Sequence, residues 1–182
     1  TFLAAASLAA LRASAAGAFV CVSKRDSRYL ELSDGSPYIP IGLNLIAPPE
    51  RAHDGTPGLR VYEEWLDQHA ANGGNYVRAW LSNPFWDVEH GRSREYDESQ
   101  ARRIDALLEM ARARGIRVKM TMEHFRSIGG GAQAWADKPL HHVANGGTAD
   151  SIADFFDGER SRALFRGKIA WFAKRFGDRP EV

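Results

Sequence analysis

Residues 75–125 read NYVRAWLSNPFWDVEHGRSREYDESQARRIDALLEMARARGIRVKMTMEHF and hold two strand patterns on either side of a helix pattern. Apolar residues alternate in NYVRAWLS and again in IRVKMTMEHF, which predicts two strands. Between them, Asp97 followed three residues later by Gln100 is typical of a helix start, and Gly115 is typical of a helix end. The apolar face of this helix comprises Ile104, Leu107, Leu108 and Ala111. Such a unit predicts parallel strands and the α/β fold class.

The same alternation continues on both sides of this unit. On the N-terminal side, Asp34-Gly35 separates two strand-like runs, Tyr29–Leu32 and Tyr38–Ile41, which predicts a small β-hairpin leading into a buried strand. A helix pattern in VYEEWLDQHAANGG, residues 61–74, follows that strand. On the C-terminal side, a Gly-rich segment precedes a last helix whose apolar face comprises Phe165, Ile169, Phe172 and Phe176. The predicted order is strand then helix, three times.

Each predicted strand has one apolar face and one face that becomes polar toward its carboxyl end. The polar faces carry Asn44, Arg78 and Glu123. These side chains would be costly under the helices of a doubly wound sheet but suit the mouth of a barrel, and no glycine-rich nucleotide motif follows a strand. We therefore predict a partial (β/α)8 TIM barrel, the first three repeats preceded by the hairpin. The apolar faces comprise Ile39, Ile41, Leu43 and Leu45, then Val77, Ala79 and Leu81, then Ile116, Val118, Met120 and Met122.

Length and composition limit the possible functions. The chain has 182 residues with 44% hydrophobic content, which suits a globular domain but is shorter than the roughly 250 residues of a closed eightfold barrel. A formal charge of +1 gives no global field that would attract nucleic acid or an acidic membrane surface, so we expect neither as a partner. The single cysteine, Cys21, excludes an internal disulfide and a multi-thiolate zinc site.

The first eighteen residues, TFLAAASLAALRASAAGA, are small and apolar. Ala16-Gly17-Ala18 fits the cleavage site of a secretory signal peptide, which predicts a secreted or periplasmic domain over residues 19–182. An alanine-rich N-terminal helix is the alternative interpretation. The segment is too short and too interrupted to span a bilayer.

Side chains at the end of the second predicted strand are candidates for a binding site. Arg78 and Trp80 lie on one strand face, and the next loop adds Phe85, Trp86 and Tyr96. Aromatic rings beside charged donors are typical of sugar sites, because a ring stacks on the C–H face of a pyranose while charged groups bind its hydroxyls.

Two structural alternatives to these functional assignments stay open. Phe85 and Trp86 would anchor their loop if they pack on the adjacent helix. Arg78, Lys119 and Glu123 would neutralise one another if they meet inside the fold.

Two further chemistries are not favoured by the sequence. His141 and His142, with Asp137 or Asp150, superficially suggest a metal site. Adjacent histidines on a loop do not readily face one ion, and no H-E-x-x-H motif accompanies them, so we predict no metal. No G-x-S-x-G element is present, and Cys21 precedes the first barrel strand, so nucleophilic catalysis by serine or cysteine is not supported.

Four pieces of sequence, in this order, carry a resemblance to a known family: SPYIPIGLNL, NGGNYVRAWL, YDESQARRIDALLEMARARGIRVKMTMEHF and DFFDGERSRALFRGKIAWFAKRFGD. The chain from about Phe19 to its last residue resembles the N-terminal half of clan A retaining glycoside hydrolases, in particular the cellulase and β-mannanase type of family 5. The resemblance implies a secreted enzyme without a cofactor that acts on β-linked polysaccharide such as mannan or glucan.

The resemblance also implies roles for individual residues. By position, Arg78 matches the arginine that supports the nucleophilic carboxylate of the family. Asn44 and either Glu123 or His124 match residues that line the substrate cleft, and with Arg78, Trp80 and Trp86 they complete the predicted substrate-binding set. The two catalytic glutamates of the family close strands four and seven, so neither is expected within this chain.

The implied reaction is retaining hydrolysis, in which one glutamate protonates the leaving oxygen and a second, roughly 5–5.5 Å away, attacks the anomeric carbon. We expect Glu181-Val182 to lead into strand four and the C-terminal half of the barrel to follow, so that this chain alone is inactive. A non-catalytic carbohydrate-binding or assembly protein built on half a barrel is the competing hypothesis.

Overall fold

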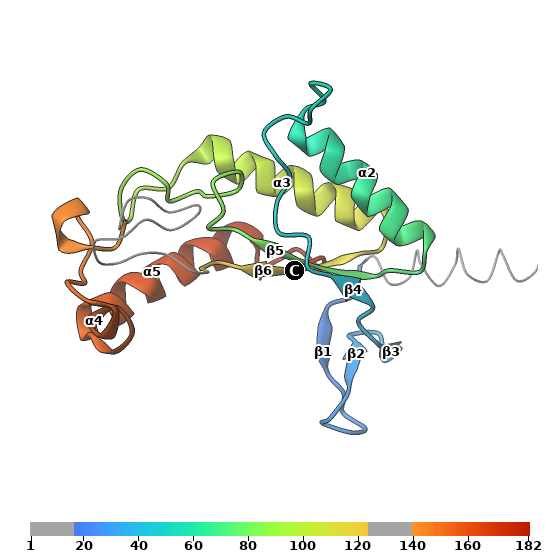
Figure 1. Cartoon of the computed structure of the whole chain (residues 1–182). Helices are drawn as coiled ribbons and strands as arrows, with labels where there is room; N and C mark the ends of the chain where they lie inside the picture. The colour runs from blue at the N-terminus through green and yellow to red at the C-terminus, as the bar shows by residue number, and fades with distance from the viewer. Residues whose placement is uncertain (1–16, 124–139) are drawn as a thin grey trace, which may run out of the picture.

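The computed structural model describes residues 17–123 and 140–182, which form a small antiparallel sheet beside a larger layered unit (Figure 1). The antiparallel sheet has the order β1 (Val20–Val22), β2 (Leu30–Leu32), β3 (Pro37–Tyr38). Leu30 pairs with Tyr38, and Gly35 adopts the left-handed φ of 86° that the turn between them requires. The predicted hairpin is confirmed with shorter strands, and β1 adds a third strand to it.

The larger unit is built on a parallel sheet with the order β4 (Gly42–Leu43), β5 (Tyr76–Trp80), β6 (Arg117–Thr121). Helix α2 (Gly58–Ala71) connects β4 to β5, and α3 (Glu98–Ala113) connects β5 to β6. After β6 the described chain forms the 3-10 turn η1 (Val143–Asn145), α4 (Ile152–Asp157) and α5 (Glu159–Phe176). The predicted alternation and the α/β class are confirmed.

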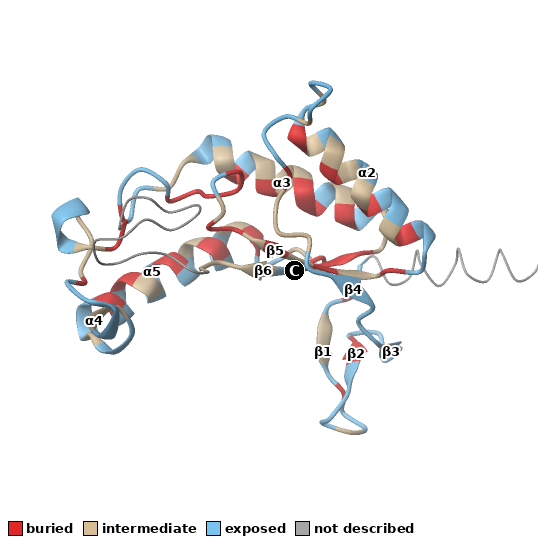
Figure 2. Cartoon of the chain, in the orientation of Figure 1, coloured by how far each residue is buried: buried red, intermediate tan, exposed pale blue. Residues whose placement is uncertain are grey.

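Most of the core lies between the parallel sheet and helices α2 and α3, whose inward positions are buried in Figure 2. Val77, Ala79 and Leu81 of the second predicted strand are all buried, as the alternation predicts. The third strand begins in the same way with Ile116 and Val118. Burial of this apolar surface is the main favourable term for such a unit.

The first predicted strand differs from the prediction. Ile39, Ile41 and Leu43 are 70%, 55% and 55% exposed, so the prediction of a buried strand after the hairpin is wrong for these side chains. The strand proper is limited to β4, and a groove of about 420 Å³ remains beside it, lined by Leu43, Leu45 and side chains of α2.

The buried face of helix α5 differs in part from its predicted apolar face. Its buried positions are Ser161, Leu164, Lys168, Phe172 and Phe176, whereas Ile169 is 41% exposed. The prediction is confirmed for Phe172 and Phe176 and wrong for Ile169, because the buried face continues through Lys168 and Leu164 in the first half of the helix. A buried lysine requires an anionic partner, and the partner is described below.

Beyond α5 the chain returns to the sheet. The N–H of Val118 in β6 donates to the carbonyl of Glu181, with a distance of 2.6 Å between nitrogen and oxygen. None of the helices in the two described ranges combines the length and apolar character needed to cross a membrane.

Helix α3 begins as the sequence predicts. The side chain of Asp97 accepts hydrogen bonds from the N–H groups of Ser99 and Gln100, at 2.6 and 3.3 Å. His90 Nε2 also lies 2.9 Å from the other carboxylate oxygen. The contact with His90, together with the bonds from Ser99, holds the pKa of Asp97 well below its ordinary value of 3.8.

Replacing Asp97 with alanine is therefore expected to lower Tm at neutral pH. A carboxyl group whose pKa is lower in the folded state stabilises that state above its unfolded pKa and loses this effect as the pH falls. The difference in Tm between D97A and the parent chain should shrink below about pH 4, near the unfolded pKa of aspartate. Asp97→Asn, which keeps an acceptor oxygen, is the control. A Tm difference between D97A and the parent chain that does not change with pH would contradict the stabilising role of the Asp97 carboxylate.

Candidate functional site at the carboxyl ends of the parallel strands

Arg78 lies in β5 between the buried Val77 and Ala79, on the sheet face opposite to them. Its Nε donates to Oγ1 of Thr121 in the neighbouring strand β6, at 3.0 Å. Its guanidinium carbon lies 5.4 Å from the ring centroid of Trp80. All three side chains are half-buried, so the face of the sheet away from α2 and α3 carries a positive charge held by a hydroxyl and an aromatic ring.

The register explains why these residues meet. Arg78 is paired with Lys119 and Trp80 with Thr121, so all four lie on one face of adjacent parallel strands. Lys119 is exposed. The structure thus brings together Arg78 and Trp80 from the predicted substrate-binding set and adds Thr121, which the sequence analysis did not select.

Glu123 follows β6 and forms an ion pair with Lys168 of α5. The side chain of Lys168 is 1% exposed. Lys168 Nζ also lies 3.0 Å from Oε2 of Glu89, which is fully buried in the loop after β5. Lys168 of α5 thus neutralises the charge of Glu123. The alternative in which Arg78, Lys119 and Glu123 neutralise one another is therefore wrong for Glu123.

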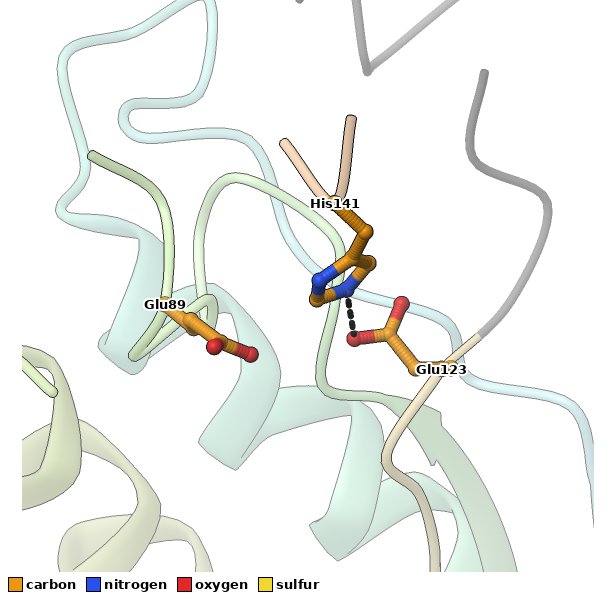
Figure 3. Close-up of side chains that lie close together, drawn as sticks. All are labelled: Glu89, Glu123 and His141. Atoms are coloured by element: carbon orange, nitrogen blue, oxygen red, sulfur yellow. Dashed lines mark hydrogen bonds and ion pairs between the residues drawn. The ribbon is translucent and has the colours of Figure 1, made fainter. Parts of the chain in front are cut away.

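His141 completes this buried cluster (Figure 3). Its Nε2 lies 3.3 Å from Oε1 of Glu123, and its Nδ1 lies 3.4 Å from the hydroxyl of Ser93. The imidazole is stacked on Phe155, with 5.2 Å between the ring centroids. The cluster therefore connects both loops after the strands to α4 and α5.

The donor atoms of Glu89, Glu123 and His141 lie within 4.8 Å of one another, which is a spacing that a metal ion could use. The ammonium group of Lys168, however, already contacts both carboxylates. A divalent ion would have to displace this cation, so the donor set fits an internal ion pair better than a metal site.

The two adjacent histidines have separate roles. His141 lies in the buried cluster, whereas His142 accepts a hydrogen bond from the N–H of Ala144 and caps η1. Asp150 is exposed, and Asp137 lies outside the described residues.

Trp86 is completely buried, and its predicted role as a sugar-stacking ring is wrong. Its Nε1 donates to the carbonyl of Ile46 at 3.1 Å, and its ring makes edge contacts with Tyr62 and Phe85. The loop-anchor alternative holds for Trp86 and for Phe85, because both rings fill the core beneath the loop.

The remaining predicted residues have different positions. Asn44 follows β4 and is exposed. His124 lies outside the described residues.

Glu89 and Lys168 were missed by the sequence analysis. Lys168 had a usable signal, since it lies four residues after Leu164 and four before Phe172, on the buried side of the helix. Glu89 had none, because a loop position carries no periodic pattern that would indicate burial.

Trp86→Phe is expected to lower the free energy of unfolding by about 2 kcal/mol, from lost core volume and an unpaired Ile46 carbonyl. Urea unfolding monitored by circular dichroism would measure this change. A stability equal to that of the parent chain would contradict the anchoring role of Trp86.

Comparisons with known proteins address the fold. No protein-family model matches this chain, and no curated protein matches it either. Among solved structures, the exo-β-1,4-mannosidase Op5Man5 from Opitutaceae bacterium strain TAV5 superposes with a TM-score of 0.52 and 23% identity, over 83% of this chain and 25% of that one. A glycoside hydrolase family 5 mannosidase from Rhizomucor miehei gives 0.50 and 15%, over 88% of this chain and 42% of that one.

The chain thus spans about a quarter of the length of the first of these enzymes and less than half of the second. At these identities the likeness concerns the fold. The strands and helices of the described residues are arranged like part of the fold of these two enzymes.

Proposed function

We propose that the chain is the N-terminal part of a (β/α)8 glycosidase that hydrolyses a β-linked polysaccharide such as mannan or glucan with retention of configuration. The observation that carries this proposal is the group of Arg78, Trp80 and Thr121 at the carboxyl end of adjacent parallel strands. Active sites of barrel enzymes are built at this end of the strands.

The chemistry of this group fits a role in positioning. The Arg78 guanidinium is held by Thr121 and lies beside the Trp80 ring, so it is a fixed, permanently charged donor. Such a donor can orient a carboxylate and keep it ionised, which a nucleophilic carboxylate requires. Trp80 and the exposed Asn44 would contribute contacts to the sugar.

The edges of the parallel sheet support the barrel part of the proposal. Apolar side chains remain exposed at the β4 edge, and a groove of about 430 Å³ beside β6 is lined by Val118, Met120, Met122, Phe172 and Phe176. Further strand and helix repeats would cover both edges. The Val118 to Glu181 hydrogen bond lies where a fourth parallel strand would begin.

In this proposal the two catalytic carboxylates are contributed by residues that follow Val182. One would protonate the leaving oxygen and the other would attack the anomeric carbon, with no cofactor. The present chain would bind substrate and position the nucleophile through Arg78. Residues 1–18 would act as a secretion signal.

The test is hydrolysis by the protein from the reading frame continued beyond Val182. We expect release of reducing sugar from β-1,4-mannan or β-1,4-glucan, and a strand ending in Asn-Glu soon after Val182. A protein that binds these glycans without cleaving them would support the non-catalytic hypothesis and overturn the proposal.

A further inference from the structure

A second cavity lies away from Arg78, between the loop after β5, the segment before α4 and the first half of α5. Its volume is about 550 Å³, and its walls include Arg94, Tyr96, Thr148, Arg160 and Leu164. This is the size range of sites that bind small molecules. None of these residues belongs to the proposed glycosidase site.

Two exposed arginines, Arg94 and Arg160, line this cavity, and no carboxylate is among its lining residues. Most arginines of the described chain form ion pairs, for example Arg175 with Glu98 and Asp105. Within residues 17–123 and 140–182, no ion pair or hydrogen bond engages the guanidinium of Arg94 or of Arg160. Since arginine binds carboxylates through two parallel N–H groups, a pair of them suits an anionic ligand.

The cavity walls are fixed to one another by contacts behind them. The N–H of Arg94 donates to Glu89 at 2.5 Å, and Glu89 pairs with Lys168 on α5, the helix that carries Arg160. This bond holds Arg94 at a φ of 72°, a left-handed conformation that is uncommon for a residue other than glycine. The buried ion pair thus connects the two segments that carry the guanidinium groups.

Two more contacts join the same walls. The Tyr96 ring is stacked on Trp171 of α5, with 4.7 Å between centroids, and the hydroxyl of Thr148 lies 3.0 Å from that of Ser161. Burial raises the pKa of Tyr96 to about 12, so its hydroxyl is protonated at neutral pH and can donate. These contacts hold the Arg94 backbone, the Tyr96 ring and the Thr148 hydroxyl in place, so this part of the cavity loses little conformational entropy when it binds a ligand.

The remaining walls of the cavity suit a sugar ring. Ala163 and Leu164 give an apolar surface, and Gly167 leaves open space, since a Cβ added there would meet no atom within 4 Å. From the two lining arginines, the hydroxyls and this apolar surface, we propose that the cavity binds a sugar acid, with its carboxylate between Arg94 and Arg160. The sugar part of this inference rests on the proposed function, and the anionic part does not.

The experiment titrates the 182-residue chain with D-glucuronate, D-glucose and inorganic sulfate by isothermal titration calorimetry at low salt. We expect glucuronate to bind, sulfate to bind more weakly and glucose not to bind at this cavity. Arg94→Gln and Arg160→Gln should each weaken glucuronate binding about tenfold or more, the loss of one charge-assisted hydrogen bond pair. Arg102→Gln, an exposed arginine of α3 outside the cavity, is the matched control and should bind as the parent does.

Gly167→Leu gives an independent readout, because it fills the cavity without removing a charge and removes a helix-destabilising glycine. We expect it to abolish glucuronate binding while the chain remains as stable as the parent or more so. Unchanged binding in R94Q, R160Q or G167L, or equal binding of sulfate and glucuronate, would overturn the inference. Failure of the proposed function would appear differently, as absence of glycan hydrolysis with glucuronate binding intact.

Discussion

Arg78→Ala in the proposed glycosidase is expected to lower kcat/KM on β-linked glycan by on the order of 100-fold or more, as loss of an electrostatic stabiliser in an active site typically does. Most of the loss should fall on kcat, because the proposed partner of Arg78 is the nucleophile rather than the substrate. Stability should change little, since among residues 17–123 and 140–182 the half-buried side chain makes one hydrogen bond, to Thr121, and one contact with the Trp80 ring. Steady-state kinetics and thermal unfolding measure the two effects separately.

Arg78→Lys and Arg102→Ala are the matched variants. Lysine keeps the positive charge but lacks the several N–H groups with which a guanidinium can contact Thr121 and a carboxylate at the same time. R78K should therefore recover part of the activity that R78A loses. Arg102 is an exposed arginine of α3, and its removal should leave kcat unchanged. An R78A enzyme as active as the parent would mean that the group on β5 and β6 has no part in catalysis.

Lys168→Ala is expected to have the largest effect on folding, about 3–5 kcal/mol of lost stability, the typical result of removing one partner from a buried ion pair. The variant leaves Glu89, which is fully buried, and Glu123, with a side chain only 12% exposed, without their shared cation. Urea unfolding of the 182-residue chain measures the loss.

Two comparisons test this explanation. Lys174→Ala removes an exposed lysine from the same helix and should cost almost nothing. The triple variant Lys168→Met, Glu89→Gln and Glu123→Gln removes all three charges and should be more stable than K168A. If K168A and K174A unfolded at the same urea concentration, the cluster would not stabilise the connection between α5 and the sheet.

The elements with a strong local pattern could be predicted from the sequence. Asp97 caps α3 as expected, and the alternation in β5 placed Val77 and Ala79 in the core and Arg78 on the opposite face. In each case the signal comes from neighbouring residues, through helix capping or the two-residue period of a strand.

Features that depend on distant contacts could not be predicted in this way. Trp86 looks like an exposed aromatic in a polar loop, yet the Ile46 carbonyl and Tyr62, far from it in sequence, define its pocket. The pairing of Glu89 with Lys168 joins a loop to a helix almost eighty residues later and leaves no local trace. The same long-range contact shapes the cavity that carries Arg94 and Arg160.

We propose above that this chain is part of a glycosidase that retains configuration. The most direct test is proton NMR of the first sugar released when the protein from the reading frame continued beyond Val182 is incubated with a β-linked manno- or gluco-oligosaccharide. The account predicts that the β-anomer appears first and converts to the α-anomer only by mutarotation, because two successive inversions restore the configuration. Initial release of the α-anomer, or no cleavage at all, would contradict it.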